Sequence, residues 1–412
     1  IIFSCLALHT LSTFSSNNQT DFLSLLAMKK AIDVDPNGAL NSWNRTTNFC
    51  RWNGTTCGRM HPDRVVAINL GNLSFLRIIS LGNNSFSGRI PLEIGLLRRL
   101  EYIEFSNNSF FGSIPKNMSQ CKSLVYINLI NNNLSGNIPP EIGLLYNLQS
   151  LYLGKNIFSG HIPQTIGNLT SLGAISLSHL EKLGIYLTQI VGKIHSEIGG
   201  LLGLKHLRLS NNNLEGPIPL SIGRLFNLHI LELGGNRLTS RIPPVFGNLT
   251  LLYSISLERN NFSGTIPTSL ANCTNMKMLD LSVNNFDGPI PQEILISTVC
   301  IFLDLSHNAL TNSIQLEFGS LRNLEELDLS NNKLSGLIPR SLGTCVSLEG
   351  LYLYDNLFEG QIPNELSSLM GLTDLDLSRN NLSGSIPSFL GDLDLQNLNL
   401  SFNSFQGRLL EC

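Results

Sequence analysis

The chain has 412 residues, of which 42% are hydrophobic and 14% are charged, and its 27 Lys and Arg against 30 Asp and Glu leave a net charge of −3. A charge so near zero provides no strong attraction to nucleic acid or to an anionic membrane surface, so we expect neither as a partner. The length taken alone favours two or three globular domains, because a single hydrophobic core stops growing below this size.

The chain begins with an apolar stretch, residues 1–16, that is too short to span a membrane and is followed by small polar residues. This pattern is typical of the hydrophobic part of a secretory signal peptide, and a buried N-terminal strand is the alternative. Because the sequence does not begin with Met, we expect the signal to be incomplete. The interpretation predicts a secreted or extracellular location.

Residues 17–62 combine an amphipathic helical pattern from Asp21 to Ile32 with a Trp-rich segment that contains Cys50 and Cys57. Two cysteines seven positions apart beside Trp52 suit a disulfide in an oxidising compartment. Metal ligation is the alternative, which is disfavoured because no His lies at ligand spacing near them. We therefore expect a small lid closed by a disulfide.

From residue 63 to residue 412 the unit L-x-x-L-x-L-x-x-N-x-L-x-G-x-I-P recurs about fourteen times, mostly at intervals of 24 residues, for example from Leu324 to Pro339. The L-x-L alternation has the period of a short strand with Leu facing inward. The Asn after each strand, one source of the chain's 46 Asn residues, can donate and accept hydrogen bonds where the chain turns. The Gly predicts a position with positive φ or without room for a Cβ, although Ser240 and Asn312 replace it.

This unit, with its G-x-I-P ending, resembles the plant extracellular class of leucine-rich repeat. The resemblance implies an α/β repeat solenoid: a right-handed leucine-rich repeat superhelix with a parallel concave sheet, a second short sheet on one flank and an N-terminal helical cap. Residues 17–62 resemble the cap of that family. The length then corresponds to one extended array that grows by adding turns, because each turn buries its Leu against the next.

Two parts of the array are irregular. At 63–81 only 11 residues separate Ile68 from Ile79, so the first repeat is expected to be truncated. At 173–195 one repeat is eight residues longer than the regular 24. The sequence therefore allows its concave strand to lie either at Ile175 or at Leu183. The repeats run to residue 412, so we expect no C-terminal cap and no membrane span in this chain.

Outward residues of a stacked sheet form continuous columns, so a binding surface is sought there. Tyr102 and Tyr126 share one column and Tyr152 lies one turn further in the next, while Tyr352 and Tyr354 form a second aromatic group. Exposed Tyr clusters are typical interface anchors. Ordinary surface aromatic content is the alternative.

Asp280, Asp304 and Asp328 fall in one column on three consecutive turns. Like charges one strand apart repel each other, and a basic peptide group or a cation would relieve that repulsion. The alternative is structural, because L-D-L is common in this class of repeat, and we favour it since solvent weakens interactions between exposed carboxylates.

The sequence contains N-x-S/T sequons throughout. Four of them lie in the convex phase of the repeat, where a glycan has room, and one lies in the expected cap. We predict glycosylation at Asn44, Asn117, Asn168, Asn248 and Asn272.

Motifs of catalysis are missing: there is no protein-kinase signature, no P-loop and no H-E-x-x-H, so we expect no enzymatic activity, no cofactor and no metal site. The cap sequence, including C-R-W-N-G-T-T-C, resembles the cap sequence of immune receptor kinases that sense bacterial proteins. The resemblance implies the extracellular ectodomain of a plant receptor-like kinase or receptor-like protein, which binds a peptide or protein ligand on its concave face in defence signalling.

That resemblance also implies a co-receptor kinase as a second partner, and a membrane span with a serine/threonine kinase in a full-length parent. Two alternatives stay open. One is a secreted inhibitor of microbial cell-wall-degrading enzymes, and the other is a truncated receptor fragment without function of its own.

Overall fold

The computed structural model describes residues 40–52, 55–57, 65–68, 76–177, 189–296 and 299–407, together with Phe22, Leu25, Leu26 and Lys29. The expected signal peptide lies outside the described residues. Within them, no helix is long and apolar enough to cross a membrane.

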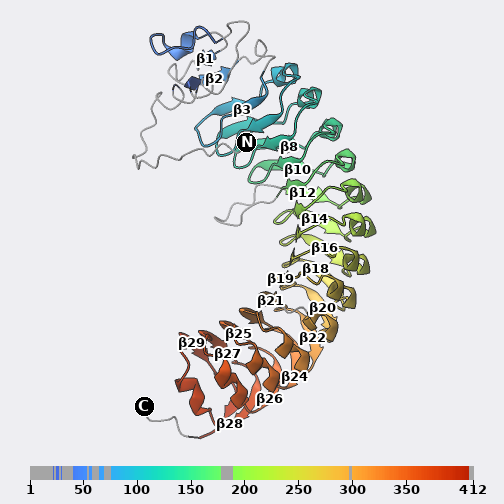
Figure 1. Ribbon diagram of the computed structural model, residues 1–412, viewed down its shortest axis with the longest axis vertical. Coiled ribbons are helices and arrows are strands. Elements are labelled where there is room, and N and C mark those ends of the chain that lie inside the picture. Colours follow the sequence, from blue (N-terminus) through green and yellow to red (C-terminus); the bar gives the residue numbers. More distant parts are fainter. Residues whose placement is uncertain are drawn as a thin grey trace.

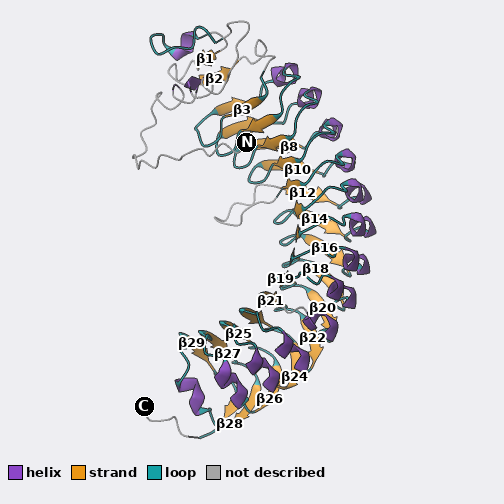
Figure 2. Cartoon of the chain, viewed as in Figure 1, coloured by secondary structure: helices purple, strands orange, loops and turns teal. Residues whose placement is uncertain are grey.

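The described turns stack into one curved array (Figure 1), which confirms the predicted leucine-rich repeat solenoid. Each regular turn contributes one short strand to a concave sheet, one to a sheet on the flank and one 3-10 helix. Figure 2 shows these helices along the outer side of the arc, most plainly in its N-terminal half.

The concave sheet is parallel and has fourteen strands in chain order. Its strands are β3 (Ile78–Ser80), β5 (Tyr102–Glu104), β7 (Tyr126–Asn128), β9 (Ser150–Tyr152), β11 (Ala174–Ser176), β13 (His206–Arg208), β15 (Ile230–Glu232), β17 (Ser254–Ser256), β19 (Met278–Asp280), β21 (Phe302–Asp304), β23 (Glu326–Asp328), β25 (Gly350–Tyr352), β27 (Asp374–Asp376) and β29 (Asn397–Asn399).

The flank sheet also has fourteen parallel strands. They are β4 (Ser87–Arg89), β6 (Ser109–Gly112), β8 (Asn133–Asn137), β10 (Ile157–Gly160), β12 (Gln189–Gly192), β14 (Asn213–Gly216), β16 (Arg237–Ser240), β18 (Asn261–Gly264), β20 (Asn285–Gly288), β22 (Ala309–Asn312), β24 (Lys333–Leu337), β26 (Leu357–Gly360), β28 (Asn381–Gly384) and β30 (Ser404–Phe405).

The convex side carries short 3-10 helices, nearly all of five residues. They are η2 (Leu92–Leu96), η3 (Lys116–Gln120), η4 (Pro140–Leu144), η5 (Gln164–Asn168), η6 (Ser196–Gly200), η7 (Leu220–Arg224), η8 (Pro244–Asn248), η9 (Thr268–Asn272), η10 (Gln292–Ile296), η11 (Leu316–Ser320), η12 (Arg340–Thr344), η13 (Asn364–Ser368) and η14 (Ser388–Gly391). Most begin directly after the Pro of the Ile-Pro pair, whose fixed φ suits entry into a helix.

The N-terminal part contains η1 (Phe49–Arg51) and an antiparallel pair of strands, β1 (Thr55–Cys57) and β2 (Val65–Ile68). Cys50 and Cys57 form a disulfide with their Cα atoms 5.4 Å apart. Because β2 pairs with β1, the concave sheet begins at β3.

Aromatic side chains fill this N-terminal part. Trp43 and Trp52 are buried and stack with ring centroids 5.4 Å apart. Lys29 Nζ donates hydrogen bonds to the carbonyls of Leu40 and Trp43, at 2.8 Å each. Most of the helix expected from Asp21 to Ile32 lies outside the described residues, so it stays a prediction.

The core consists of the inward Leu and Ile side chains of the strands, stacked turn upon turn. Ile103, Ile127 and Leu151 occupy equivalent positions on β5, β7 and β9 and are fully buried. Each such side chain contributes about 1.5–3 kcal/mol when buried, which requires a covering turn on both sides.

A buried or half-buried Asn at the end of most concave strands joins neighbouring turns. Asn156 Nδ2 donates to the carbonyls of Leu153 (3.0 Å) and Gly154 (3.1 Å) in its own turn. It also donates to Leu129 O in the preceding turn (2.8 Å), while its Oδ1 accepts from Leu134 N (3.0 Å). One amide therefore satisfies four backbone groups at the point where the chain leaves the sheet.

The Gly position of the repeat has positive φ, as expected; Gly112 has φ 79° and Gly336 has φ 79°. Ser240 and Asn312 stand at the same position and also adopt positive φ, 74° and 70°. The backbone conformation is therefore retained at both exceptions, although it is unfavourable for a residue with a Cβ.

The ambiguity at 173–195 is settled by β11. Ile175 pairs in register with Leu151 on one side and Leu207 on the other, so the strand lies at Ile175. Leu183, the other reading, lies outside the described residues. The additional residues thus follow the concave strand and precede β12.

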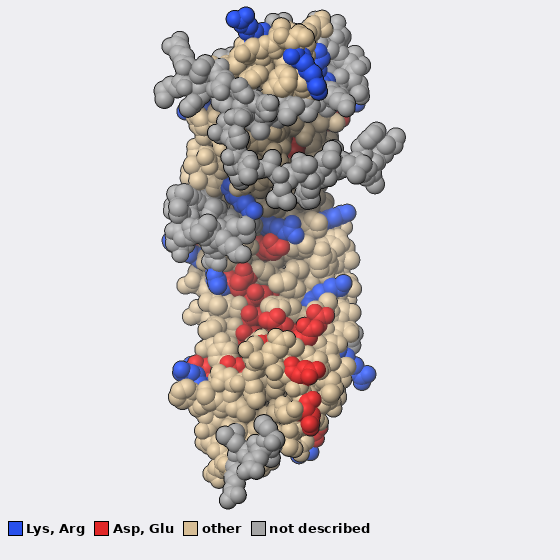
Figure 3. All heavy atoms as spheres, turned by 90° about the vertical axis from the view of Figure 1, so that its left-hand side faces the viewer, with Lys and Arg blue, Asp and Glu red and all other residues tan. Residues whose placement is uncertain are grey.

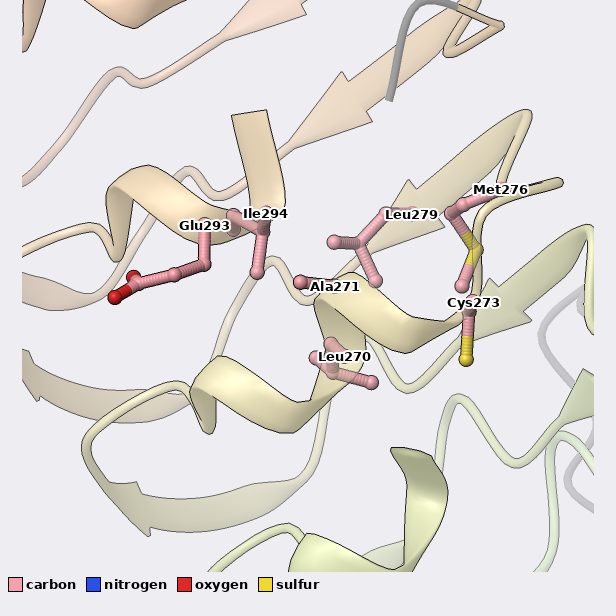
Figure 4. Close-up of a pocket in the computed structure, with 7 residues that line it drawn as sticks. All are labelled: Leu270, Ala271, Cys273, Met276, Leu279, Glu293 and Ile294. Atoms are coloured by element: carbon pink, nitrogen blue, oxygen red, sulfur yellow. The ribbon is translucent and has the colours of Figure 1, made fainter. Parts of the chain in front are cut away.

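A small cavity of ≈20 Å³ lies between η9 and η10. It is lined mainly by apolar side chains, among them Leu270, Met276 and Ile294, and Figure 4 shows the carboxylate of Glu293 pointing away from them. A space this small holds at most about one water molecule, so we regard it as a packing gap.

We predict that Asn156→Ala lowers the free energy of unfolding by roughly 3 kcal/mol, because it leaves buried backbone groups without hydrogen-bond partners. Urea unfolding of the secreted chain measures this change. The matched control is Asn147→Ala, which removes one hydrogen bond from an exposed Asn to Lys122 O. Equal effects of the two substitutions would contradict a special role for the buried Asn.

Candidate functional site

The concave strands present two columns of outward side chains, which flank the middle residue of each strand; this residue is buried in every strand except the last, β29. The first concave column comprises Ile78, Tyr102, Tyr126, Ser150, Ala174, His206, Ile230, Ser254, Met278, Phe302, Glu326, Gly350, Asp374 and Asn397. The second concave column comprises Ser80, Glu104, Asn128, Tyr152, Ser176, Arg208, Glu232, Ser256, Asp280, Asp304, Asp328, Tyr352, Asp376 and Asn399.

Tyrosines form a contiguous group near the N-terminal end of the columns. Tyr102 and Tyr126 stack in parallel, with ring centroids 4.1 Å apart and an interplanar angle of 2°. Tyr126 and Tyr152 meet edge to face at 5.7 Å. The structure thus brings together the three tyrosines that the sequence singled out, all of them half-buried.

A carboxylate orders this tyrosine group. Tyr126 Oη donates to Glu104 Oε2 (3.3 Å), and Asn128 Nδ2 donates to the same oxygen (2.9 Å). Burial, the hydrogen bond with Tyr102 and the negative charge of Glu104 all raise the pKa of Tyr126 well above its usual value. The phenol therefore stays neutral and acts as a hydrogen-bond donor over the physiological range.

Basic and imidazole side chains occupy the middle of the face. His206, His229 and Tyr253 form a ladder on successive turns, with ring centroids 6.5 and 6.1 Å apart. Arg208 Nε and Glu232 Oε1 form an ion pair at 2.9 Å. Desolvation and the charge of Arg208 lower the pKa of His206, so this ring is neutral near pH 7.

The three aspartates predicted to share a column do lie on adjacent strands in register, with Asp280 opposite Asp304 and Asp304 opposite Asp328. One oxygen of each aspartate accepts a hydrogen bond from the backbone N–H two residues later. These bonds are Ser282 N to Asp280 (3.0 Å), Ser306 N to Asp304 (2.9 Å) and Ser330 N to Asp328 (2.8 Å).

The same turn is closed by an Asn elsewhere in the second concave column. Asn128 Oδ1 accepts from Ile130 N (3.1 Å), and Asn399 Oδ1 accepts from Ser401 N (3.2 Å). This equivalence supports the structural interpretation of the L-D-L pattern. The second oxygen of each Asp is still available to the concave face.

Burial raises the pKa of two of these carboxylates, most clearly that of Asp280. Desolvation raises its pKa to about 6, and the negative charges of Asp304 and Glu258 add to the effect, while hydrogen bonds from Ser282 oppose it. Desolvation also raises the pKa of Asp328. Both groups are therefore less stable as anions than an exposed Asp.

A hollow of ≈230 Å³ opens on the concave face over β21, β23, β25 and β27. Its lining residues are Ile301, Phe302, Glu325, Glu326, Glu349, Gly350, Tyr352, Thr373 and Asp374. It contains one residue predicted from the sequence, Tyr352. Tyr354, Asp304 and Asp328 do not line it.

The four acids of this hollow were missed by sequence reasoning. Glu326 and Asp374 belong to the first concave column, whereas Glu325 and Glu349 precede it, so no single column shows them together. These four acids could have been found in the sequence by counting acidic residues over several neighbouring columns together. From Ile301 to Asp376 the residue before each strand and both outward strand positions contain seven acids and no Lys or Arg.

Figure 3 shows this acidic band along the C-terminal half of the concave face, with Lys and Arg gathered nearer to its middle and at its edges. The face is therefore divided by chemistry along its length into aromatic, mixed basic and acidic parts. In the described portion of the chain, no group of three or more His, Cys, Asp and Glu is arranged to hold a metal ion.

The predicted glycosylation sites lie away from this face. Asn117, Asn168, Asn248 and Asn272 are on η3, η5, η8 and η9 of the convex side, and all four are exposed. Asn44 is half-buried in the N-terminal part, where its Oδ1 accepts hydrogen bonds from Thr46 and Thr47.

Family models match most of the array. The model described as "Leucine rich repeat N-terminal domain" matches residues 18–58. The two models described as leucine-rich repeats match 302–358 and eight further segments, which together exceed half of the chain: 75–97, 99–121, 123–145, 147–169, 203–225, 227–249, 251–273 and 371–393.

Among curated proteins, the chain is 39% identical over 93 residues to the Arabidopsis thaliana LRR receptor-like serine/threonine-protein kinase EFR. That match covers 19% of this chain and 9% of the kinase, so the chain corresponds to only a small part of this relative.

Solved plant ectodomains resemble the chain over most of its length. The LRR ectodomain of the Arabidopsis thaliana receptor kinase GASSHO1/SCHENGEN3, in complex with CASPARIAN STRIP INTEGRITY FACTOR 2, aligns with a TM-score of 0.79 and 35% identity over 83% of this chain and 40% of that one. The plant peptide hormone receptor RGFR1, in complex with RGF2, aligns with a TM-score of 0.64 and 32% identity over 86% and 65%.

We predict that Asp280→Asn stabilises the fold at neutral pH and not in acid. Because the folded pKa is about 6, above the usual 3.8, the folded chain retains a proton that the unfolded chain releases between about pH 4 and 6. Stability therefore falls as pH rises through this window. Asn keeps the acceptor for Ser282 and removes the charge.

The expected gain at pH 7 is roughly 1 kcal/mol, after allowance for solvent screening, and it vanishes at pH 4. Urea unfolding at the two pH values measures it. Asp287→Asn, at an exposed position of β20 on the flank, is the control with no expected gain. A gain of equal size at both pH values would contradict the electrostatic explanation.

Proposed function

The chain belongs to the leucine-rich repeat family, and we propose that it is the extracellular ligand-binding part of a plant receptor-like kinase or receptor-like protein, taking a peptide or protein ligand on its concave face in defence signalling. It acts in this proposal by binding and not by catalysis. A co-receptor kinase would be its second partner.

The observation that carries the proposal is the composition of the concave columns. Where a purely structural repeat needs only small polar residues, these columns present stacked Tyr102 and Tyr126 and an acidic hollow beside Tyr352. Aromatic side chains that are rigidly held and half-exposed are typical of interface hot spots. The aromatic and acidic groups lie about ten turns apart on one continuous surface, which suits an extended ligand.

Similar plant receptors support the binding of a ligand in general. Of the solved receptors described above, one is a plant peptide hormone receptor in complex with RGF2, and the other is a receptor kinase ectodomain in complex with CASPARIAN STRIP INTEGRITY FACTOR 2. The defence role rests on the resemblance of the cap sequence, including C-R-W-N-G-T-T-C, to immune receptor kinases. The disulfide between Cys50 and Cys57 suits an extracellular location.

We predict that the secreted chain retains specific peptides from a digest of bacterial proteins, and that Tyr126→Ala weakens their binding at least tenfold because it removes the centre of the tyrosine group. Retained peptides are identified by mass spectrometry and their affinities measured by calorimetry. Tyr146→Ala, at an exposed position of the convex side, is the matched control and leaves binding unchanged. A folded chain that retains no peptide, or that captures a microbial cell-wall-degrading enzyme instead, would overturn the proposal.

We also propose N-linked glycans at Asn44, Asn117, Asn168, Asn248 and Asn272. Glycopeptide analysis of the chain secreted from plant cells is expected to find them. Replacing the four convex Asn residues by Gln should remove four glycans while leaving peptide binding unchanged, since η3, η5, η8 and η9 lie opposite the concave face. A fully secreted chain without glycans at these sites would contradict this assignment.

A further inference from the structure

The acidic hollow exists because one side chain is missing from the first concave column. Phe302, Glu326, Gly350 and Asp374 are neighbours in register on β21, β23, β25 and β27. Adjacent strands lie about 4.8 Å apart, so Glu326 and Asp374 flank Gly350 on its two sides. Gly350 has no side chain and is itself buried, because the ring of Tyr352 lies over its backbone, so this ring forms the floor of the hollow.

The walls of the hollow are aromatic. Phe302 stands two turns before Gly350 within the first concave column. The ring of Tyr352 lies across the floor, since a Cβ placed on Gly350 would come within 3.0 Å of Tyr352 Cε2 and 3.2 Å of its hydroxyl. Both rings are half-buried, which leaves aromatic faces and edges open to a ligand. A bare ring of carboxylates would lack this apolar contact.

The rim carries four carboxylates, those of Glu325, Glu326, Glu349 and Asp374. Asp374 is held in place because it accepts hydrogen bonds from Thr373 Oγ1 (2.6 Å) and Asn397 Nδ2 (2.5 Å). These two bonds lower its pKa, so the group is a fixed anion at neutral pH.

No cation neutralises this rim from within the described part of the chain. The ion pairs there join Arg77 to Glu101, Lys116 to Glu141, Arg208 to Glu232 and Arg340 to Glu365, and none involves a rim carboxylate. The consequence is visible at Glu326, whose pKa is raised by desolvation and then by the charges of Asp304, Asp328 and Asp374. A cation in the hollow would relieve this repulsion.

The chemistry of the hollow selects among cations. A metal ion would gain nothing from the two rings, and the carboxylates are not arranged as metal ligands. An ammonium group is a strongly hydrated point charge, whereas a guanidinium group is flat, weakly hydrated and forms paired hydrogen bonds to carboxylates while stacking on aromatic rings. The volume of ≈230 Å³ has room for several water molecules, at about 30 Å³ each, which an arginine side chain would displace.

We propose that the hollow over Gly350 is the seat of an arginine side chain of the peptide ligand, so that the chain recognises a basic peptide whose Arg lies against Tyr352 and Phe302 and pairs with the rim carboxylates. This inference rests on the proposed function, because it names the chemical class of the ligand that the concave face takes. It also assigns specificity-determining roles to Glu326, Glu349 and Gly350.

The test uses the full secreted chain and hexa-arginine as the probe, with affinity measured by calorimetry at physiological salt. The double variant Glu326→Gln with Glu349→Gln is expected to weaken binding at least tenfold. Its control, Glu93→Gln with Glu317→Gln, removes the same charge from the first turns of η2 and η11 on the convex side and should change affinity less than twofold. Equal losses in the two double variants would overturn the proposal in favour of unspecific attraction between charges.

A second variant tests the shape of the hollow without changing its charge. Gly350→Leu displaces the ring of Tyr352 from the floor, occupies part of the hollow and leaves every rim carboxylate in place, so it is expected to weaken hexa-arginine binding at least tenfold while the chain stays folded by circular dichroism. Unchanged binding by a folded Gly350→Leu variant would overturn the assignment of the hollow. Hexa-lysine, of equal charge, is expected to bind at least fivefold more weakly than hexa-arginine, and equal affinity would overturn the assignment to guanidinium.

The outcomes distinguish this inference from the function on which it rests. Retention of bacterial peptides that lack Arg, combined with unchanged hexa-arginine binding in the Gly350→Leu variant, would overturn the arginine seat and leave the receptor function standing. Hexa-arginine binding that depends on Gly350, in a chain that retains no bacterial peptide, would support the seat and contradict the defence function.

Discussion

A buried or half-buried Asn amide, present in most turns, is the interaction on which the rest of this structure depends. Asn156 bonds to backbone groups of its own turn and of the turn before it, and the same arrangement recurs along the array. Since a solenoid has no contacts between distant turns, its stability is a sum of such neighbour interactions. The amide also fixes how each turn is placed on the next, because its bonds require one particular register.

That fixed register is what makes the concave face usable as a binding surface. Residues 24 positions apart are brought into contact at the spacing of adjacent strands, so Tyr102 stacks on Tyr126 and Asp280 faces Asp304. A tyrosine or aspartate that has no similar neighbour within its own turn therefore lies next to an identical residue of the adjacent turn. Repulsion between acids and stacking between aromatic rings are therefore properties of the stack and not of any local motif.

The scaffold and the surface share residues in the acidic part of the face. Each Asp of the second concave column uses one oxygen to close its turn, so its charge is present whether or not a ligand needs it. The rim of the hollow is different. Glu325, Glu326 and Glu349 make no hydrogen bond that closes a turn in the described residues, and their charge therefore has no evident structural purpose.

The sequence by itself determined the repeat, its inward Leu positions, the hydrogen-bonding Asn and the backbone conformation at the Gly position, because each of these follows from the period of the pattern within one turn. The chain order of the concave strands also followed from it. Tertiary structure alone placed the irregular strand at Ile175, since only pairing with Leu151 and Leu207 distinguishes it from the alternative. It alone also showed the hollow over Gly350, because Glu325 and Glu349 precede the strands of two turns, whereas Asp374 lies within the strand of a third, and they meet only when those turns are stacked.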